Sequence, residues 1–150
     1  MKWKNLQKPK KLEKEELGEK LGRFISEPFE RGYAVAIGNA LRRILLSSIP
    51  GNAITSVKIE GVQHEFQNIP GVMEDVSEII LNLKQVKLVL EGDAAKKIYL
   101  EASGEREVTA ADIKADSDIK VLNPELHIAT LTSRDAKIVM EMEVDSGRGY

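Results

Sequence analysis

Apolar side chains between residues 30 and 52 recur with the period of an α-helix. At 100° per residue, one broad arc carries Ile37, Leu41, Ile44, Leu45, Ser48 and Ile49. The opposite arc carries Asn39, Arg42 and Arg43, and Leu46 falls between the two arginines. A purely solvated arc would carry a polar residue at that position, so the pattern predicts a helix that makes contacts on both sides.

Proline and glycine predict where this helix ends. Pro50 lacks a backbone N–H and disfavours helical backbone at Ile49, while Gly51 tolerates positive φ. We therefore expect the helix to end near Ser48 and a type II turn to follow, with Pro50 and Gly51 at its centre. Gly38 lies inside the helical pattern and leaves two alternatives: the helix begins after Gly38, or another helix approaches closely there.

From residue 53 onward both periods occur, which indicates a mixed domain. Residues 53, 55, 57 and 59 alternate with their polar neighbours as in a half-buried strand, and residues 71–83 follow a helical period. Acidic residues at the start of this second helix and Lys84 at its end have the signs that the helix dipole favours. Further strands are expected over 86–90, 98–102, 119–122, 127–131 and 138–144. Because helices and strands do not alternate regularly, we expect an α+β fold with mainly antiparallel sheets and two principal helices.

Composition narrows the chemistry that the chain can perform. A net charge of −2 makes the whole chain a weak electrostatic partner for nucleic acid. The chain has no cysteine, which excludes disulfides, thiolate nucleophiles and cysteine-ligated zinc. It shows no secretory h-region and no apolar run of membrane-spanning length, so we expect a cytoplasmic protein without a membrane partner.

The first 20 residues differ from the rest, with seven lysines, four glutamates and few apolar residues. We interpret them as a solvated or frayed leader rather than a phosphate-binding arm. Trp3 and Leu6 could allow part of this leader to pack as an edge strand.

A search for catalytic motifs finds none that would support an enzyme. The P-loop, GxGxxG and HExxH patterns are absent. His64 and His127 are far apart, and we expect each to be a partly buried polar residue at a strand. Asp112, Asp116 and Asp118 lack the glycine and glutamate of a calcium loop. We therefore expect no catalytic residue, no metal site and no cofactor on this chain.

Five blocks of sequence resemble the amino-terminal domain of the bacterial RNA polymerase α subunit. The most specific are Phe24–Gly51 (FISEPFERGYAVAIGNALRRILLSSIPG) and Gly71–Lys84 (GVMEDVSEIILNLK). Shorter blocks follow in the family's order: Val108–Ile113 (VTAADI), Leu122–Thr132 (LNPELHIATLT) and Gly147–Tyr150 (GRGY). Together they cover most of residues 21–150, although Ala34–Ile37 (AVAI) is more apolar than is usual in the family.

The resemblance implies a dimerisation domain that is interrupted by an α+β insert domain. After the leader (residues 1–20), residues 21–52 match the first part of the dimerisation domain, residues 53–145 the insert, and residues 146–150 the start of the return segment. Family members continue well past this point, so we expect a fragment of a longer protein. Leu41, Ile44 and Leu45 would then lack part of their packing partner and form an apolar association surface.

The resemblance also implies a non-catalytic scaffold that forms a homodimer and recruits the β and β′ subunits, which perform nucleotidyl transfer. DNA would be reached only indirectly, through the complex. The implied β contact consists of Arg42, Arg43 and Leu46, with Arg43 the more important arginine, and a preceding turn of Glu30, Arg31 and Gly32. The implied dimer and core face consists of Ile37, Leu41, Ile44 and Leu45. A weaker candidate surface for β′ consists of Glu74, Asp75 and Lys84.

Two other classes of function remain as alternatives. The chain could be a stand-alone nucleic-acid-binding module that uses the basic leader with Arg42 and Arg43, and steep salt dependence of binding would favour it. A small-molecule enzyme would need a pocket with strongly shifted titratable groups.

Overall fold

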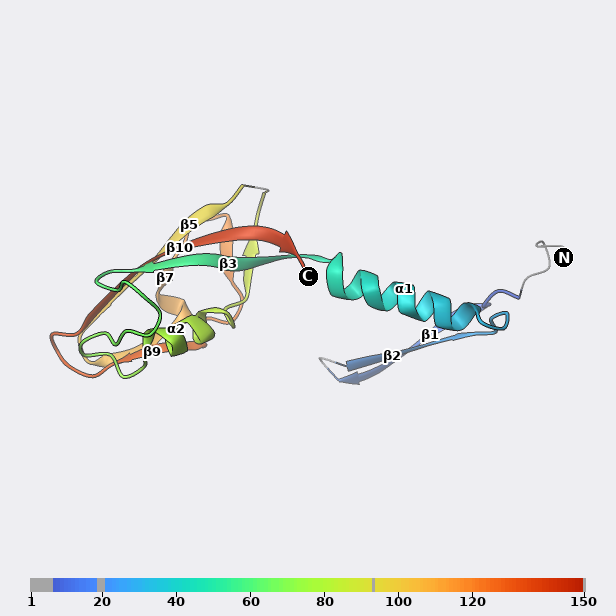
Figure 1. Cartoon of the computed structure of the whole chain (residues 1–150), viewed down its shortest axis with the longest axis horizontal. Helices are drawn as coiled ribbons and strands as arrows, with labels where there is room; N and C mark the ends of the chain where they lie inside the picture. The colour runs from blue at the N-terminus through green and yellow to red at the C-terminus, as the bar shows by residue number, and fades with distance from the viewer. Residues whose placement is uncertain (1–6, 19–20, 93, 150) are drawn as a thin grey trace. The chain divides into compact units, whose positions relative to one another are not determined.

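A computed structural model describes residues 7–18, 21–92 and 94–149. The chain divides into two units between Ile49 and Pro50 (Figure 1). The described residues form two α-helices and several sheets whose strands all pair antiparallel. The predicted α+β class is confirmed.

The first unit contains a hairpin of β1 (Lys11–Gly18) and β2 (Leu21–Glu27), followed by α1 (Tyr33–Ser47). Of the predicted solvated or frayed leader, the segment from Lys11 to Gly18 is solvated but not frayed, because it pairs with β2, Lys11 opposite Glu27. The side chains of β1 are exposed, as the leader pattern predicted, and opposite charges meet across the hairpin, with Arg23 3.4 Å from Glu15. Trp3 and Leu6 lie outside the described residues.

Helix α1 begins before Gly38, so the alternative in which the helix starts after Gly38 is wrong. Gly32 has a φ of 89° and turns the chain into the helix, so the first helical residue is Tyr33. A Cβ placed on Gly38 would meet nothing within 4 Å, so the described chain brings no second helix close to it. The helix ends at Ser47, near the predicted position, and the Ser48 N–H donates to the Ile44 carbonyl at 2.9 Å.

The type II turn expected at Pro50 and Gly51 is absent, because both residues belong to strand β3 (Pro50–Ile59). Pro50 pairs with Arg148 and Gly51 with Gly147 on β10 (Lys137–Arg148). Proline is tolerated as the first residue of an edge strand, since it need not donate to the ladder there. The long strand β10 thus extends β3 into the region where the local sequence indicated a turn.

The second unit is built on a four-stranded antiparallel sheet in the order β3–β10–β5–β7, with β10 alongside β3 and β5 (Figure 1). Its other strands are β5 (Lys96–Ser103) and β7 (Ile113–Lys114). Two smaller sheets pair β4 (Leu88–Leu90) with β8 (Ile119–Val121), and β6 (Arg106–Thr109) with β9 (His127–Leu131). The remaining elements are α2 (Val76–Leu83) and the short 3₁₀ helix η2 (Ala110–Asp112).

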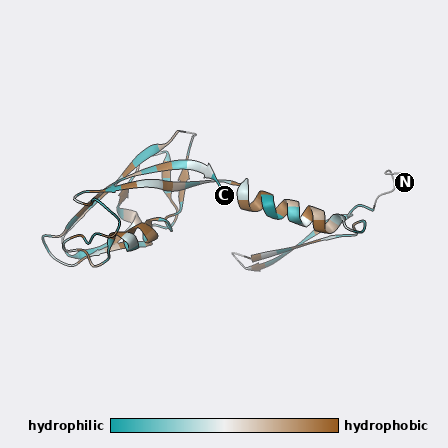
Figure 2. Cartoon of the chain, viewed as in Figure 1, coloured by the Kyte–Doolittle hydropathy of each residue, from teal (hydrophilic) through white to brown (hydrophobic). Residues whose placement is uncertain are grey.

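The core of the second unit lies between the inner sheet face and α2. Alternate residues of β5 and β10 are almost completely buried, as the period of two predicted: Ile98, Leu100, Ala102, Ile138, Met140, Met142 and Val144. Ile79 of α2 is also completely buried. Figure 2 shows apolar residues alternating with polar ones along these strands. Burial of each large aliphatic side chain contributes about 1.5–3 kcal/mol.

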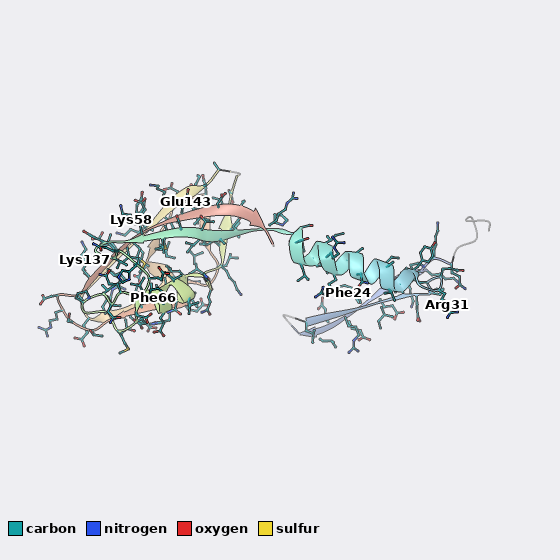
Figure 3. The ribbon with its side chains drawn as sticks, in the orientation of Figure 1. Phe24, Arg31, Lys58, Phe66, Lys137 and Glu143 are labelled. Atoms are coloured by element: carbon teal, nitrogen blue, oxygen red, sulfur yellow. The ribbon has the colours of Figure 1, made fainter. Side chains whose placement is uncertain are left out.

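The outer face of the sheet carries charged side chains, among them Lys58, Lys137 and Glu143 (Figure 3). Strand β3 departs from simple alternation here. Ile54 pairs with Val144 and Ser56 with Glu143, so Thr55 has no partner and forms a bulge. Ile54 therefore packs against the core and Thr55 is exposed, the reverse of the predicted alternation.

Helix α2 is shorter than the predicted range of 71–83. Residues 71–74 instead lie along β9: the Met73 N–H donates to the Thr130 carbonyl at 3.0 Å, and Thr132 donates to Gly71 at 2.8 Å. The helix begins where Asp75 caps it, since the Asp75 carboxylate accepts from the Glu78 N–H at 2.7 Å. Lys84 follows the last turn, as the sequence predicted.

Candidate assembly surfaces

Helix α1 has no buried residue among the described parts of the chain. Its predicted apolar arc is open to solvent, with exposed fractions of 40% for Ile37, 54% for Leu41, 53% for Ile44 and 63% for Leu45. The apolar bands of this helix are visible in Figure 2. Soluble proteins seldom leave such a continuous apolar surface uncovered, so the arc has the character of an association surface.

The opposite arc of α1 is exposed as well. Leu46 is 60% exposed and lies between the exposed residues Arg42 and Arg43. Among the described residues, neither guanidinium group lies within 4.0 Å of a carboxylate. Two free guanidinium groups beside an exposed leucine can hold carboxylates or carbonyls of another molecule around an apolar anchor.

Glu30, Arg31 and Gly32 form the turn that leads into α1. The Glu30 carbonyl accepts from the Tyr33 N–H at 3.1 Å, and its carboxylate accepts from the Gln7 N–H at 3.3 Å. Within this turn, Arg31 is exposed (Figure 3). The hairpin of the same unit also exposes apolar side chains, with Phe24 of β2 60% exposed. Whether these residues contact β stays a prediction.

The three residues suggested for a β′ contact lie in different environments. Asp75 and Lys84 are exposed at the two ends of α2, so a contact through them stays a prediction. Glu74 is only 8% exposed and cannot belong to the same open surface. It is buried because residues 71–74 run along β9 instead of beginning the helix, which directs the carboxylate towards β9.

Glu74 is the centre of a polar network that sequence reasoning missed. Its Oε2 accepts from the Thr130 N–H at 2.7 Å, and its Oε1 accepts from the Thr130 hydroxyl at 2.9 Å. The same Oε1 lies 2.9 Å from Nε2 of His127, whose Nδ1 lies 2.8 Å from Oε1 of Glu107 on β6. His127 therefore bridges two carboxylates from two other segments.

These contacts shift the pKa values of Glu74 and His127. Burial alone raises the pKa of Glu74, but hydrogen bonds from Thr130 and His127 outweigh burial and hold that pKa below its ordinary value. Burial alone lowers the pKa of His127, but the hydrogen bonds and negative charges of Glu107 and Glu74 raise it above its ordinary value. The pair is thus stabilised in its charged form.

The sequence contains little signal for this network. The period of two places His127 and Thr130 on opposite faces of a strand. The ladder between β6 and β9 is irregular, because Val108 pairs with Ala129 while Thr109 pairs with His127. This irregularity lets both side chains reach Glu74. His127 is a partly buried strand residue, as expected, whereas His64 is exposed in a loop and that expectation was wrong.

Two of the three aspartates considered as a calcium loop have side-chain partners. Asp112 accepts from Arg106 at 2.8 Å and from the Thr109 N–H at 3.0 Å, and Asp118 pairs with Lys96. Within residues 7–18, 21–92 and 94–149, no three His, Asp or Glu side chains are arranged to hold a metal ion. In the same part of the chain, neither helix has the length and hydropathy needed to cross a bilayer.

Comparison with known proteins identifies the relatives of this chain. Residues 57–150, well over half of the chain, match the family described as RNA polymerase Rpb3/RpoA insert domain. Similar curated proteins are DNA-directed RNA polymerase subunits alpha. The protein from Symbiobacterium thermophilum is 57% identical over 129 residues, which cover 86% of this chain and 41% of the relative. The protein from Carboxydothermus hydrogenoformans is 53% identical over 145 residues, which cover 97% of this chain and 46% of the relative.

The relative from Clostridium perfringens strain 13 is 60% identical over 129 residues. The chain spans less than half the length of these curated relatives. The resemblance to the α subunit that the sequence blocks indicated is confirmed. The chain belongs to the RNA polymerase Rpb3/RpoA insert domain family and corresponds to the amino-terminal region of the α subunit.

Proposed function

We propose that this chain is a non-catalytic assembly scaffold of a bacterial, cytoplasmic DNA-directed RNA polymerase. Two copies dimerise through the apolar arc of α1 and recruit β through the arginine arc and β′ through the second unit. The observation that carries this proposal is the exposure of both arcs of one helix within its own chain. Nucleotidyl transfer is then the work of the partner subunits, and this chain supplies no catalytic residue or cofactor.

The size of the apolar arc supports dimerisation. Each of its four aliphatic side chains is about half exposed, so covering it recovers about 1 kcal/mol. A symmetric pair of helices would therefore gain about 8 kcal/mol, which is comparable with the cost of association of about 4–15 kcal/mol. The helix pair alone is marginal, so a stable dimer also needs apolar side chains of the hairpin, such as Phe24 and Leu12.

The arginine arc supports binding of a second kind of partner. Arginine is enriched among the residues that dominate interfaces, and its guanidinium group can bind a carboxylate through two parallel hydrogen bonds. Arg43 is the arginine that we propose as the main contact to β, with Leu46 as the apolar anchor. Asp75 and Lys84, at the two ends of α2, are the residues that we propose for β′.

The test is co-expression of the chain with the β subunit, followed by co-purification and sedimentation. Arg43→Ala should abolish recovery of β while the dimer persists, because the two arcs are opposite. Arg134→Ala provides a matched control, since it removes an exposed arginine from the second unit. If Arg43→Ala recovers as much β as the control, the assignment of this arc is wrong.

The nucleic-acid-binding alternative has weaker support. In the described part of the leader, Lys11 and Lys14 form ion pairs with Glu13 and Glu16 of the same strand. This pairing reduces the positive charge that could neutralise phosphates. If the 150-residue chain bound duplex DNA with a steep salt dependence, the nucleic-acid-binding alternative would be favoured instead.

A further inference from the structure

Both ring nitrogens of His127 face carboxylate oxygens. Nε2 lies 2.9 Å from Glu74 and Nδ1 lies 2.8 Å from Glu107. A neutral imidazole carries only one N–H, so only the doubly protonated ring can donate to both carboxylates. The geometry therefore selects the imidazolium form.

The charged groups around the ring reinforce this selection. Glu107 faces it from β6, and Glu74 faces it from the segment that precedes α2. Arg106 of β6 is held by Asp112 of η2 instead, at 2.8 Å. Helix α2 contributes the neutral Asn82, which donates to the Ile128 carbonyl at 3.0 Å. The ring thus has two anionic neighbours, one at each nitrogen.

The two carboxylates differ in what would happen if the ring lost a proton. Glu74 is buried and is also held by the N–H and hydroxyl of Thr130. The side chain of Glu107 is 63% exposed and can exchange the ring for water. Loss of the Nε2 proton would leave a ring lone pair facing a buried carboxylate, whereas loss of the Nδ1 proton requires only that Glu107 turn to solvent.

We propose that His127 is a proton-controlled latch that ties Glu107 and Glu74 to β9 when doubly protonated, and releases only Glu107 when it loses its Nδ1 proton. The protonated latch connects β6, β9 and the segment before α2. After loss of the Nδ1 proton, the His127 side chain connects only β9 and the segment before α2. The Glu107 carboxylate then faces solvent. This proposal does not depend on the partners of α1.

The latch is tested by ¹⁵N-detected imidazole NMR of the 150-residue chain during a pH titration. His64→Gln assigns the signals, because His64 is the other histidine of the chain. We expect His127 to be doubly protonated at pH 6 and to keep its Nε2 proton at the alkaline end. A neutral ring that carries its proton on Nδ1 would overturn the proposal.

Two variants separate the latch from a general charge effect. Glu107→Gln should lower the titration midpoint of His127 by about one pH unit, because an opposite charge within hydrogen-bond distance is lost. Glu101→Gln also removes an exposed carboxylate, from β5, and should leave the midpoint unchanged. Equal midpoints in the wild-type chain and Glu107→Gln, or equal shifts in the two variants, would overturn the proposal. If either variant perturbs the fold, the tautomer of the neutral His127 ring in the wild-type chain still tests the proposal.

Discussion

Replacement of Glu74 by alanine should destabilise the second unit by about 3 kcal/mol at pH 7. The carboxylate accepts from the Thr130 N–H, from the Thr130 hydroxyl and from His127, at 2.7–2.9 Å. A hydrogen bond to a charged group contributes about 1.5–3 kcal/mol, but bonds that share one carboxylate are not additive. The substitution also leaves the Thr130 N–H without its acceptor, which costs a further part of the total.

The loss is measurable by urea unfolding of the 150-residue chain, followed by far-UV circular dichroism. The transition midpoint should fall while the slope stays the same, and the Tm should drop by roughly 12–24 °C. Glu125→Ala is the matched control, because it removes an exposed carboxylate from the turn before β9. A loss of less than about 1 kcal/mol, or a loss equal to that of the control, would show that the network contributes little beyond hydration of the same groups.

The remaining predictions concern backbone geometry, titration and association. Gly71→Ala should cost about 2–3 kcal/mol in urea unfolding, because φ is 76° and the new Cβ would lie 2.8 Å from the Cβ of Ala136. Gly61→Ala, with φ of 78° and no atom within 4 Å, should cost only about 1 kcal/mol; equal losses would contradict the steric argument. Because the pKa of Glu74 is lowered, its contribution is present above its ordinary value of 4.5 and lost as pH falls through the lowered pKa. Because the pKa of His127 is raised, its contribution is present below its ordinary value of 6.5 and lost as pH rises through the raised pKa. The Tm should therefore be greatest between the ordinary pKa values of 4.5 and 6.5. If a His127→Asn variant has the same dependence of Tm on pH as the wild-type chain, the alkaline loss does not come from His127. Leu41→Glu should raise the monomer fraction in sedimentation without changing the unfolding of the second unit, and an unchanged dimer fraction would exclude this arc as the dimer surface.

Much of the fold could be predicted because it follows from local patterns. The helical period of α1 and the alternation of β5 and β10 are continuous, and the structure keeps both. The errors fall where a distant segment overrides the local preference. Pro50 and Gly51 have the composition of a turn, but β10 pairs with them and extends β3. Gly71–Glu74 has helical periodicity, but hydrogen bonds to Thr130 and Thr132, at and just after the end of β9, hold the segment out of the helix.

The candidate site could be predicted in part, for similar reasons. Exposure of Leu46 between two arginines follows from the angular position of these residues on one helix. The network of Glu74, His127 and Glu107 joins residues 20 and 53 positions apart. It depends on an irregular ladder that no sequence period reveals. Local periodicity thus locates surfaces of single elements, whereas polar networks between elements require knowledge of the pairing.

Pro50 and Arg148, near the two ends of the second unit, pair with each other across adjacent strands. The two ends of this unit lie on adjacent strands, so their Cα atoms are about 5 Å apart. Domains whose two ends lie this close together tolerate circular permutation and insertion into another chain. The second unit could therefore be inserted into another chain, or circularly permuted by joining Gly149 to Pro50 through a short glycine linker.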